Sequence, residues 1–328
     1  MKTTHLGAQG PQVSAIGLGS LSMGKSGPFG ASQDEEGIRT IQEAIDRGVT
    51  LIDTGDFYGW GANEMLVGRA LAGRRRSEVI VSVKFGAMRD PGGRMLGLDA
   101  RPIAVKNFAA YSLRRLGIEV IDVYRPARLD PNVPIEETVG AIKDLIEAGY
   151  VRYLGLSEVG VETIRRAHAV HPIADVQMEY SIATRAPEQK IFPVLRELGI
   201  GATLFGVLSR GLLSGSKPSG PKDVRAHLPR FSGEAGKDNE ALVEKLGAFA
   251  AKLGRTPAQL CMAWVLAKEP GFVPLSGART PAQLDVLDAV ERTLSAEEMA
   301  ELERLIPKGA VKGSRYPEAQ MTDLDSER

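Results

Sequence analysis

Short apolar runs alternate with longer amphipathic stretches along almost the whole chain, and this alternation limits the possible folds more than any other feature. The longer stretches carry helix signals, such as Pro134 ahead of Glu136 and Glu137. The apolar runs are short enough to be strands, and their composition predicts burial on both faces. We expect eight such strands, at residues 15–19, 50–54, 79–84, 120–124, 151–156, 174–178, 201–205 and 271–275.

Strands separated by helices form parallel βαβ units. Eight units in a chain of 328 residues suit a closed barrel better than an open doubly wound sheet. We therefore expect an α/β fold, a single (β/α)8 TIM barrel that spans residues 1–328 as one domain. Two stretches lie outside the repeat: a long loop over the barrel mouth at 213–239, and a polar C-terminal tail at 310–328, for which disorder is compatible with the composition.

The charge balance excludes several kinds of partner. The 41 basic and 41 acidic residues cancel, so we expect neither nucleic acid nor a membrane surface as a partner. No apolar run approaches the ~20 residues that span a bilayer, and the first residues lack the pattern of a signal peptide, so a cytoplasmic protein is expected. Cys261 is the only cysteine and is predicted to be a buried thiol in a helix at 257–268. The helix faces predict no particular oligomeric state.

Residues 19–26, Gly-Ser-Leu-Ser-Met-Gly-Lys-Ser, match the phosphate-binding P-loop pattern. That motif requires the Lys and Ser to open a helix whose amides face the phosphates. Here Gly-Pro-Phe-Gly follows at 27–30 and no helix is predicted before Ser32, so a P-loop is not expected. A Rossmann fingerprint is rejected as well, because position 22 is Ser and no helix follows.

Three polar residues follow or close predicted strands: Asp53, Tyr58 five residues later, and Lys84. Barrel enzymes carry their catalytic groups at the carboxyl ends of the strands. A phenol is a weak proton donor at neutral pH, and a neighbouring ammonium, itself held by a carboxylate, would lower the pKa of the phenol. Together the three form a plausible general acid for carbonyl reduction. Singly, Asp53 fits a turn cap, Tyr58 a wall aromatic and Lys84 an exposed strand end.

Residues 51–71 (LIDTGDFYGWGANEMLVGRAL) and 81–86 (VSVKFG) resemble the aldo-keto reductases. The resemblance continues in order through most of the chain. It includes GLGS at 17–20, LDPNVPIEETVGAI at 129–142, AGYVRYLGLSE at 148–158, VQMEYS at 176–181, SRGLLSG at 209–215, LPRF at 228–231 and VPLSGARTPAQL at 273–284. It implies a (β/α)8 barrel that reduces aldehydes or ketones with NADPH and uses no metal. Asp53, Tyr58 and Lys84 match three members of the family's catalytic tetrad.

The resemblance also implies a set of NADPH-binding residues. Ser157 and Gln177 match the residues that hold the nicotinamide amide, Phe205 replaces a stacking Tyr, and Arg279 matches the residue that grips the 2′-phosphate. The full set is Gly19, Ser20, Ser157, Gln177, Phe205, Ser209, Arg210, Gly211, Leu212, Gly277, Arg279 and Gln283. The chain departs from the family at Glu158, usually Asn, at Gly206, usually Ser, and at Val286-Leu287, usually Glu-Asn.

The largest departure concerns the fourth catalytic residue. The family's fourth strand typically ends in His-Arg-x-Asp-Pro, whereas residues 127–131 read Ala-Arg-Leu-Asp-Pro. Losing one donor to the carbonyl oxygen commonly costs ~10²–10³ in rate. Because Asp53, Tyr58 and Lys84 remain, we expect an altered pocket rather than a dead enzyme. The substrate pocket is predicted at Trp60, Ala127 and Arg128, with Phe85, Phe231 and the loop at 213–239 near the mouth.

The sequence Ala-Arg-x-Asp together with Leu-Ser-Glu-Val-Gly at 156–160 resembles the pyridoxal reductases of this family, which reduce pyridoxal to pyridoxine with NADPH. The phenolic hydroxyl and ring nitrogen of pyridoxal offer polar partners where the imidazole is missing. A second possibility is a weakly active sensor that binds the cofactor, as in the potassium-channel β subunits that also resemble this family. Ala127 is compatible with both.

Overall fold

A closed barrel of eight parallel strands forms the centre of the computed structural model, which describes residues 1–25, 33–73, 76–221, 223–322 and 324–328. The strands follow one another around the barrel in chain order, and the last pairs with the first. They are β3 (Gly17–Gly19), β4 (Leu51–Gly55), β5 (Ile80–Phe85), β8 (Ile121–Pro126), β9 (Val151–Ser157), β10 (Ile173–Glu179), β11 (Gly201–Phe205) and β12 (Val273–Gly277). Each predicted strand is confirmed to within two residues at either end, and so is the TIM-barrel fold.

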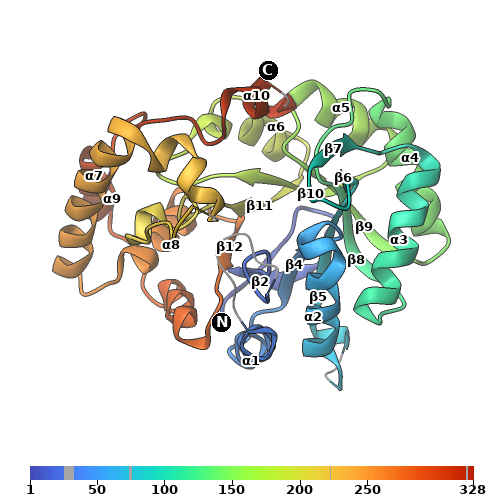
Figure 1. The fold of residues 1–328 in the computed structure, drawn as a ribbon, viewed down its shortest axis with the longest axis horizontal. Helices are drawn as coiled ribbons and strands as arrows, with labels where there is room; N and C mark the ends of the chain where they lie inside the picture. The colour runs from blue at the N-terminus through green and yellow to red at the C-terminus, as the bar shows by residue number, and fades with distance from the viewer. Residues whose placement is uncertain (26–32, 74–75, 222, 323) are drawn as a thin grey trace.

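Helices surround the barrel (Figure 1). In the described part of the chain they are α1 (Asp34–Asp46), α2 (Ala62–Leu71), α3 (Pro102–Leu116), α4 (Ile135–Glu147), α5 (Val161–Val170), α6 (Ile191–Glu197), α7 (Gly233–Lys252), α8 (Pro257–Lys268), α9 (Ala296–Leu305) and α10 (Glu318–Thr322). Helix α1 buries one stripe: Ile38, Ile41 and Ala44 recur at three- and four-residue spacing and pack into the core. Helix α8 is instead buried on all sides over Leu260–Val265. Cys261 in α8 is buried as expected, and burial raises the pKa of its thiol to about 12.

An antiparallel hairpin closes the amino-terminal end of the barrel. It consists of β1 (Thr3–His5) and β2 (Gln12–Ser14). Val13 of β2 and Leu6, directly after β1, are buried in one apolar cluster with Leu51, Val123, Val273 and Leu275 of the barrel strands. Since Leu51 and Val273 are the first residues of β4 and β12, the cluster seals the end opposite the strand termini that carry the predicted site.

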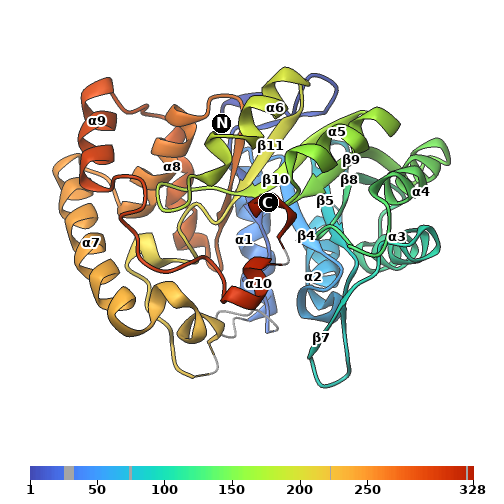
Figure 2. The same ribbon diagram turned by 90° about the horizontal axis from the view of Figure 1, so that it is seen from above.

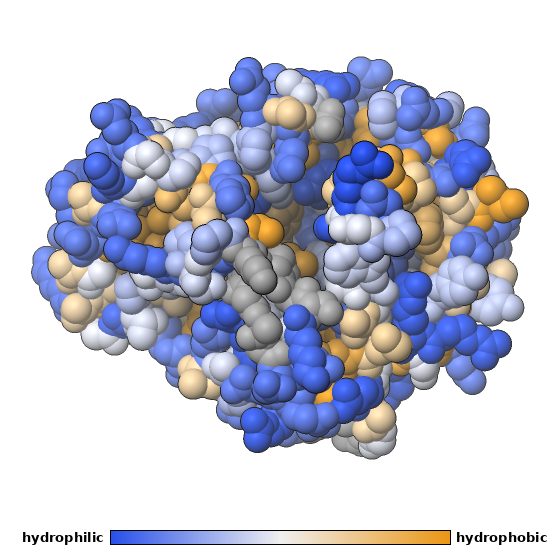
Figure 3. Space-filling model, in the orientation of Figure 1, coloured by the Kyte–Doolittle hydropathy of each residue, from blue (hydrophilic) through white to orange (hydrophobic). Residues whose placement is uncertain are grey.

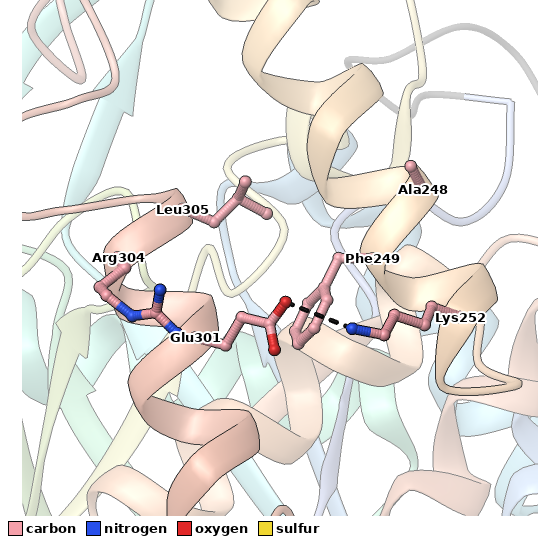
Figure 4. A pocket seen from close by; sticks show the side chains of 6 residues that line it. All are labelled: Ala248, Phe249, Lys252, Glu301, Arg304 and Leu305. Atoms are coloured by element: carbon pink, nitrogen blue, oxygen red, sulfur yellow. Dashed lines mark hydrogen bonds and ion pairs between the residues drawn. The ribbon is translucent and has the colours of Figure 1, made fainter.

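Three segments project from the other end of the barrel (Figure 2). They are a second hairpin, β6 (Ala87–Arg89) and β7 (Met95–Leu98), the described residues 212–221 and 223–231, and the C-terminal stretch that carries α10. The space-filling view of this face is hollowed near its middle, where apolar side chains show between hydrophilic ones (Figure 3). A separate shallow hollow lies between α7 and α9 on the outside of the barrel, crossed by the Lys252–Glu301 ion pair (Figure 4).

The predicted loop at 213–239 is too long at its carboxyl end, because residues 233–239 form the first two turns of α7. The remainder is held by internal bonds. Arg225, 4% exposed, makes a bidentate ion pair with Asp223 and donates to Ser216 and to the carbonyl oxygen of Lys217. The high Gly, Pro and Ser content therefore marks tight turns here.

The C-terminal stretch also differs from the polar tail expected at 310–328. Within its described part it forms α10 and a turn at Asp325–Glu327, and Arg315 is only 5% exposed. Carboxylates from distant parts of the chain pair with this guanidinium and so permit its burial. The composition of the segment alone does not reveal these partners. Of the P-loop-like motif, Ser26 lies outside the described residues, and α1 begins only at Asp34.

No helix of the described residues combines the length and the apolar character that crossing a membrane requires. Within the same residues no cluster of three or more His, Cys, Asp or Glu side chains has metal-binding geometry.

Candidate active site

Asp53, Lys84 and Gln177 meet inside the barrel. Asp53 lies in β4, Lys84 near the end of β5 and Gln177 in β10. The Nζ atom of Lys84 donates to Oδ1 of Asp53 and, at 3.1 Å, to Oε1 of Gln177. The Nε2 atom of Gln177 donates to Oδ2 of Asp53 at 2.9 Å. All three side chains are buried, so a closed hydrogen-bonded triangle fixes the ammonium group.

Tyr58 lies above this triangle because the chain turns sharply after β4. The turn Tyr58–Gly61 contains left-handed residues at Gly59 (φ 55°), Trp60 (φ 54°) and Gly61 (φ 87°). A non-glycine residue in this region is strained, and such strain gathers at functional sites. The Nζ atom of Lys84 lies 5.2 Å from the centroid of the Tyr58 ring. The structure thus brings the three predicted catalytic side chains together.

The electrostatics of Tyr58 differ from the expectation. Burial raises the pKa of the phenol well above its ordinary value, and the Asp53 carboxylate raises it further. Burial also lowers the pKa of Lys84, against the attraction of Asp53. Asp53 compensates the charge of Lys84, which is why the ammonium does not lower the phenol's pKa as predicted. Tyr58 is therefore a protonated phenol throughout the neutral range.

A second polar layer supports Asp53 from below. Ser82 donates to Oδ2 of Asp53 at 2.9 Å, and Arg125 donates to Ser82 at 2.9 Å. Arg125 also pairs with Asp175 at 2.8 Å, with both side chains fully buried. Thr203 donates to the same Asp175 oxygen at 2.7 Å. The orientation of Asp53 therefore depends on residues from four strands.

Asn63 at the start of α2 fixes the neighbouring strand ends. Its Nδ2 atom donates to the carbonyl oxygen of Ser20 at 2.9 Å, and its Oδ1 atom accepts from Thr54 at 2.8 Å. The hydroxyl of Ser20 lies 2.6 Å from Oδ1 of Asn63 and 2.8 Å from the carbonyl oxygen of Asp53. Ser20, assigned to the cofactor on resemblance, thus joins β3 to β4 with its side chain.

The residues assigned to the nicotinamide end lie at neighbouring strand ends. Ser157 closes β9 and Phe205 closes β11, while Gly19 and Gly277 pair with each other at the ends of β3 and β12. The hydroxyl oxygen of Ser157 is buried and has no hydrogen-bond partner among the described residues. An orphaned buried hydroxyl needs a partner, and a cofactor amide at this position would satisfy it. Both amide atoms of Gln177, by contrast, are bonded within the protein.

The predicted pyrophosphate loop at 209–212 is tightly wound. Ser209 (φ 48°) and Arg210 (φ 57°) are left-handed, as is Gly211 (φ 90°). The side chain of Arg210 turns inward and donates to Glu179 at 3.1 Å, while Leu212 is buried. Two consecutive non-glycine residues are thus strained, and such strain is often found at functional sites.

Arg279 and Gln283 lie after β12. The side-chain oxygen of Gln283 accepts from the backbone N–H of Arg279 at 2.8 Å, and the hydroxyl of Thr40 lies 3.3 Å from the carbonyl oxygen of Arg279. The backbone that carries Arg279 is therefore fixed from two sides, by η7 (Pro281–Val290) and by α1.

Of the predicted pocket residues, Ala127 is buried at the end of the fourth barrel strand and Arg128 is half-buried beside it. Trp60 is 59% exposed at the rim, with its ring 5.5 Å from the guanidinium carbon of Arg89 in β6. Phe85 was predicted near the mouth, but it has no exposed surface. It stacks on Tyr124 at 4.3 Å between ring centroids, because it faces the helix layer.

Glu158 has both carboxylate oxygens engaged by the protein. Oε1 accepts from the backbone N–H of Glu179 at 2.7 Å. Oε2 accepts from Arg315 at 2.5 Å and from Ser326 at 2.9 Å. Glu158, where the family usually has Asn, therefore anchors the C-terminal segment.

The sequence reasoning missed Ser82, Asn63, Asp175, Arg125 and Tyr316. A signal existed for two of these residues. Ser82 precedes Lys84, and Asp175 precedes Gln177, by two positions in a strand, which places each pair on the same face. The hydroxyl of Tyr316 accepts from Arg128 at 3.3 Å, a contact across 188 positions of the chain, so no local pattern indicates it.

Comparison with known proteins identifies the family of the chain. The model of the aldo/keto reductase family matches residues 15–307. A probable aldo-keto reductase of Glycine max is 41% identical over 323 residues, which cover 96% of this chain and 92% of the relative.

Solved structures agree as well. The glycerol dehydrogenase of Gluconobacter oxydans superposes with a TM-score of 0.83 at 28% identity, covering 92% of this chain and 94% of that one. The holo form of an aldo-keto reductase from Bacillus halodurans gives 0.79 at 28% identity, covering 100% of both chains. The family match over most of the chain and the 41% identical relative show that the chain belongs to the aldo/keto reductase family, whose members are oxidoreductases that reduce carbonyl groups with a nicotinamide cofactor.

Proposed function

We propose that this protein reduces an aldehyde or ketone to an alcohol with NADPH, and that Tyr58 is the general acid. The observation that carries the proposal is the Tyr58 phenol lying against the buried Lys84–Asp53 pair. A protonated phenol next to a fixed ammonium is the arrangement needed to deliver a proton to an oxygen that gains negative charge.

Each residue of the triad has a distinct task. Bound NADPH supplies the hydride to the carbonyl carbon. Tyr58 donates its proton to the carbonyl oxygen as charge develops there, and the Lys84 ammonium stabilises the phenolate that remains. Asp53 holds Lys84 in place, and Ser82 and Gln177 hold Asp53. Burial of Asp53 and Lys84 excludes water from their ion pair and strengthens it.

The residues that would hold NADPH line the carboxyl ends of β9 to β12 and β3. The orphaned hydroxyl of Ser157 suits the nicotinamide amide, and the ring of Phe205, at the end of β11, would cover one face of the nicotinamide. Gly19 and Gly277 leave room for the cofactor between two strand ends, and the loop at 209–212 suits the pyrophosphate. Arg279, held through Gln283, suits a 2′-phosphate because a planar guanidinium matches a phosphate dianion.

Pyridoxal is the substrate that we propose for first testing. The loss of the family's His at Ala127 removes one donor to the carbonyl oxygen, and the neighbouring Arg128 adds a positive charge at the same strand end. Pyridoxal carries its own phenolic oxygen beside the aldehyde, which such a pocket accommodates. Ala127 also fits a weakly active sensor, but the complete Asp53–Lys84–Tyr58 arrangement favours an enzyme.

The test begins with fluorescence of NADPH titrated with the protein, followed by steady-state oxidation of NADPH with a carbonyl panel that includes pyridoxal. We expect saturable NADPH binding and turnover with at least one carbonyl. Turnover of pyridoxal no faster than that of simple aromatic aldehydes would rule out the substrate assignment. Slow decay of bound NADPH with every carbonyl would support the sensor instead.

A further inference from the structure

Arg128 differs from the other cations that surround the reacting centre. Lys84 pairs with Asp53, Arg125 with Asp175, Arg210 with Glu179, and Arg315 with Glu158. Among the described residues, no carboxylate lies within 4.0 Å of the Arg128 guanidinium. Its hydrogen-bond acceptors in the described part of the chain are neutral: the carbonyl oxygen of Ala127 at 2.6 Å and the hydroxyl of Tyr316 at 3.3 Å. A half-buried cation without an ion-pair partner within 4.0 Å favours the approach of an anion, although Glu158 lies near enough for the charge of Arg128 to lower the pKa of that carboxyl.

Arg128 is also close to the reaction. It follows Ala127 at the end of β8, beside the strand that carries Lys84. Its charge acts on both catalytic groups: burial is the main cause of the lowered pKa of Lys84, and Arg128 contributes to the lowering. At Tyr58 it opposes the rise in pKa that burial causes. An anion bound at Arg128 would thus lie in the same pocket as the carbonyl.

Tyr316 completes this corner of the pocket from the C-terminal segment. Its ring lies 4.4 Å from the guanidinium carbon of Arg210, and its hydroxyl accepts from Arg128. Because that hydroxyl accepts from a guanidinium, its own proton is left to donate to a second oxygen. Arg128 and Tyr316 therefore present a cation and a neutral donor side by side.

The position of Tyr316 depends on its neighbour, Arg315. That guanidinium bonds to Glu158 at 2.5 Å and to Glu327 at 2.8 Å, and lies 3.5 Å from Glu179. Near the chain end, Asp325 accepts from the backbone N–H of Gly160 at 2.7 Å. These bonds tie the segment to the ends of β9 and β10, so Glu158 and Arg315 are positioning residues for Tyr316.

We propose that Arg128 and Tyr316 form a subsite for an ionised oxygen of the substrate. The favoured substrates are then carbonyl compounds that carry a carboxylate or phenolate on the same ring or short chain. This inference rests on the proposed carbonyl reduction and deepens it by naming the substrate class.

The experiment compares charged and neutral forms of the same substrate. The 2-, 3- and 4-formylbenzoates and their methyl esters are reduced with NADPH by the wild type, Arg128→Gln and Tyr316→Phe. We expect kcat/KM of the wild type to favour at least one formylbenzoate over its ester by about 10- to 100-fold, the range of a hydrogen bond to a charged group. Arg128→Gln should abolish this preference mainly through KM, and Tyr316→Phe should reduce it. Arg114→Gln, in the exposed part of α3, is the matched control and should change kcat/KM for neither the formylbenzoates nor their esters.

Equal use of acid and ester by the wild type would overturn the subsite while leaving the carbonyl reduction intact. An equal loss for both substrates in Arg128→Gln would also overturn it, because that result indicates a structural role. If the protein reduced neither the formylbenzoates nor their esters nor any other carbonyl compound, the proposed function itself would be refuted. The subsite can also be checked without turnover. Binding of formylbenzoate to the complex of Tyr58→Phe with NADPH is then measured by the fluorescence of the bound NADPH.

The positioning role has its own test. Arg315→Leu should raise KM for the favoured formylbenzoate and leave KM for its ester unchanged, and Arg315→Lys should restore part of the difference. Circular dichroism and NADPH binding confirm that each variant is folded. If Arg315→Leu raises both KM values equally, Arg315 does not act through Tyr316.

Discussion

Asp53→Asn separates the charge of the carboxylate from its shape. In the wild type, burial lowers the pKa of Lys84, while the Asp53 charge and hydrogen bond oppose that effect. An opposite charge at hydrogen-bond distance favours the charged form of a group and shifts its pKa accordingly by about 1–3 units. Asparagine keeps an acceptor oxygen but removes the charge, so we expect the pKa of Lys84 to fall by about 1–3 units.

The assay is kcat/KM as a function of pH for reduction of an aromatic aldehyde. Because the charged ammonium is needed to stabilise the phenolate of Tyr58, activity should fall at high pH as Lys84 loses its proton. In Asp53→Asn this alkaline limb should move to lower pH by about 1–3 units. Asp144→Asn is the control: Asp144 pairs with Lys106 at 2.7 Å on the exposed surface and should not move the limb. An unmoved limb in folded Asp53→Asn would refute the reasoning.

The same substitution has a consequence for stability. The pKa of Lys84 in the folded protein lies below its unfolded value of 10.5. Between the two values the unfolded chain binds more protons, so the free energy of unfolding rises with pH across that window. Asp53→Asn extends the window toward lower pH, and we expect a loss of about 1–4 kcal/mol at neutral pH. Urea denaturation at several pH values measures it.

Four further substitutions, one of them with a surface control, test other parts of the structure. Burial first, and then Glu64, raises the pKa of Asp56 to about 7 from 3.8. The folded protein therefore binds the extra proton, and the free energy of unfolding should fall by up to about 4 kcal/mol between pH 4 and 8. Asp56→Asn should remove this dependence in urea titrations. Asp175→Ala leaves Arg125 unpaired and should cost about 3–5 kcal/mol of unfolding free energy, whereas Asp144→Ala at the surface should cost below about 1 kcal/mol. Arg279→Gln should weaken NADPH binding about tenfold or more and leave NADH binding unchanged, as measured by fluorescence titration. Ser157→Ala should weaken binding of both cofactors about 5- to 10-fold, and equal affinities in the variant and wild type would remove Ser157 from the site.

The eight barrel strands were predictable because each is a buried apolar run between helix signals. The closing hairpin at Thr3–His5 and Gln12–Ser14 was not, since strands of three residues are too short to show a periodicity. The loop predicted at 213–239 was too long, because turn residues up to Gly233 hid the helix that begins there.

The triad of Asp53, Tyr58 and Lys84 was predictable from strand ends and motif spacing. The direction of the Tyr58 pKa was not, because it depends on how fully Asp53 compensates the charge of Lys84. The contribution of the C-terminal segment was equally hidden, since Arg315 and Glu158 lie 157 positions apart in the chain. Buried ion pairs of this kind are set by tertiary packing.

The central claim, that Tyr58 donates the proton in a site without the family's His, is tested most directly by single-turnover kinetics. NADPH-loaded wild type and Tyr58→Phe are mixed with the best carbonyl of the panel, and the loss of reduced nicotinamide is followed by stopped flow. We expect Tyr58→Phe to be slower by about 10²–10⁴-fold, the usual contribution of a general acid, with its affinity for NADPH nearly unchanged. Equal rates in the two proteins would contradict the assignment of Tyr58.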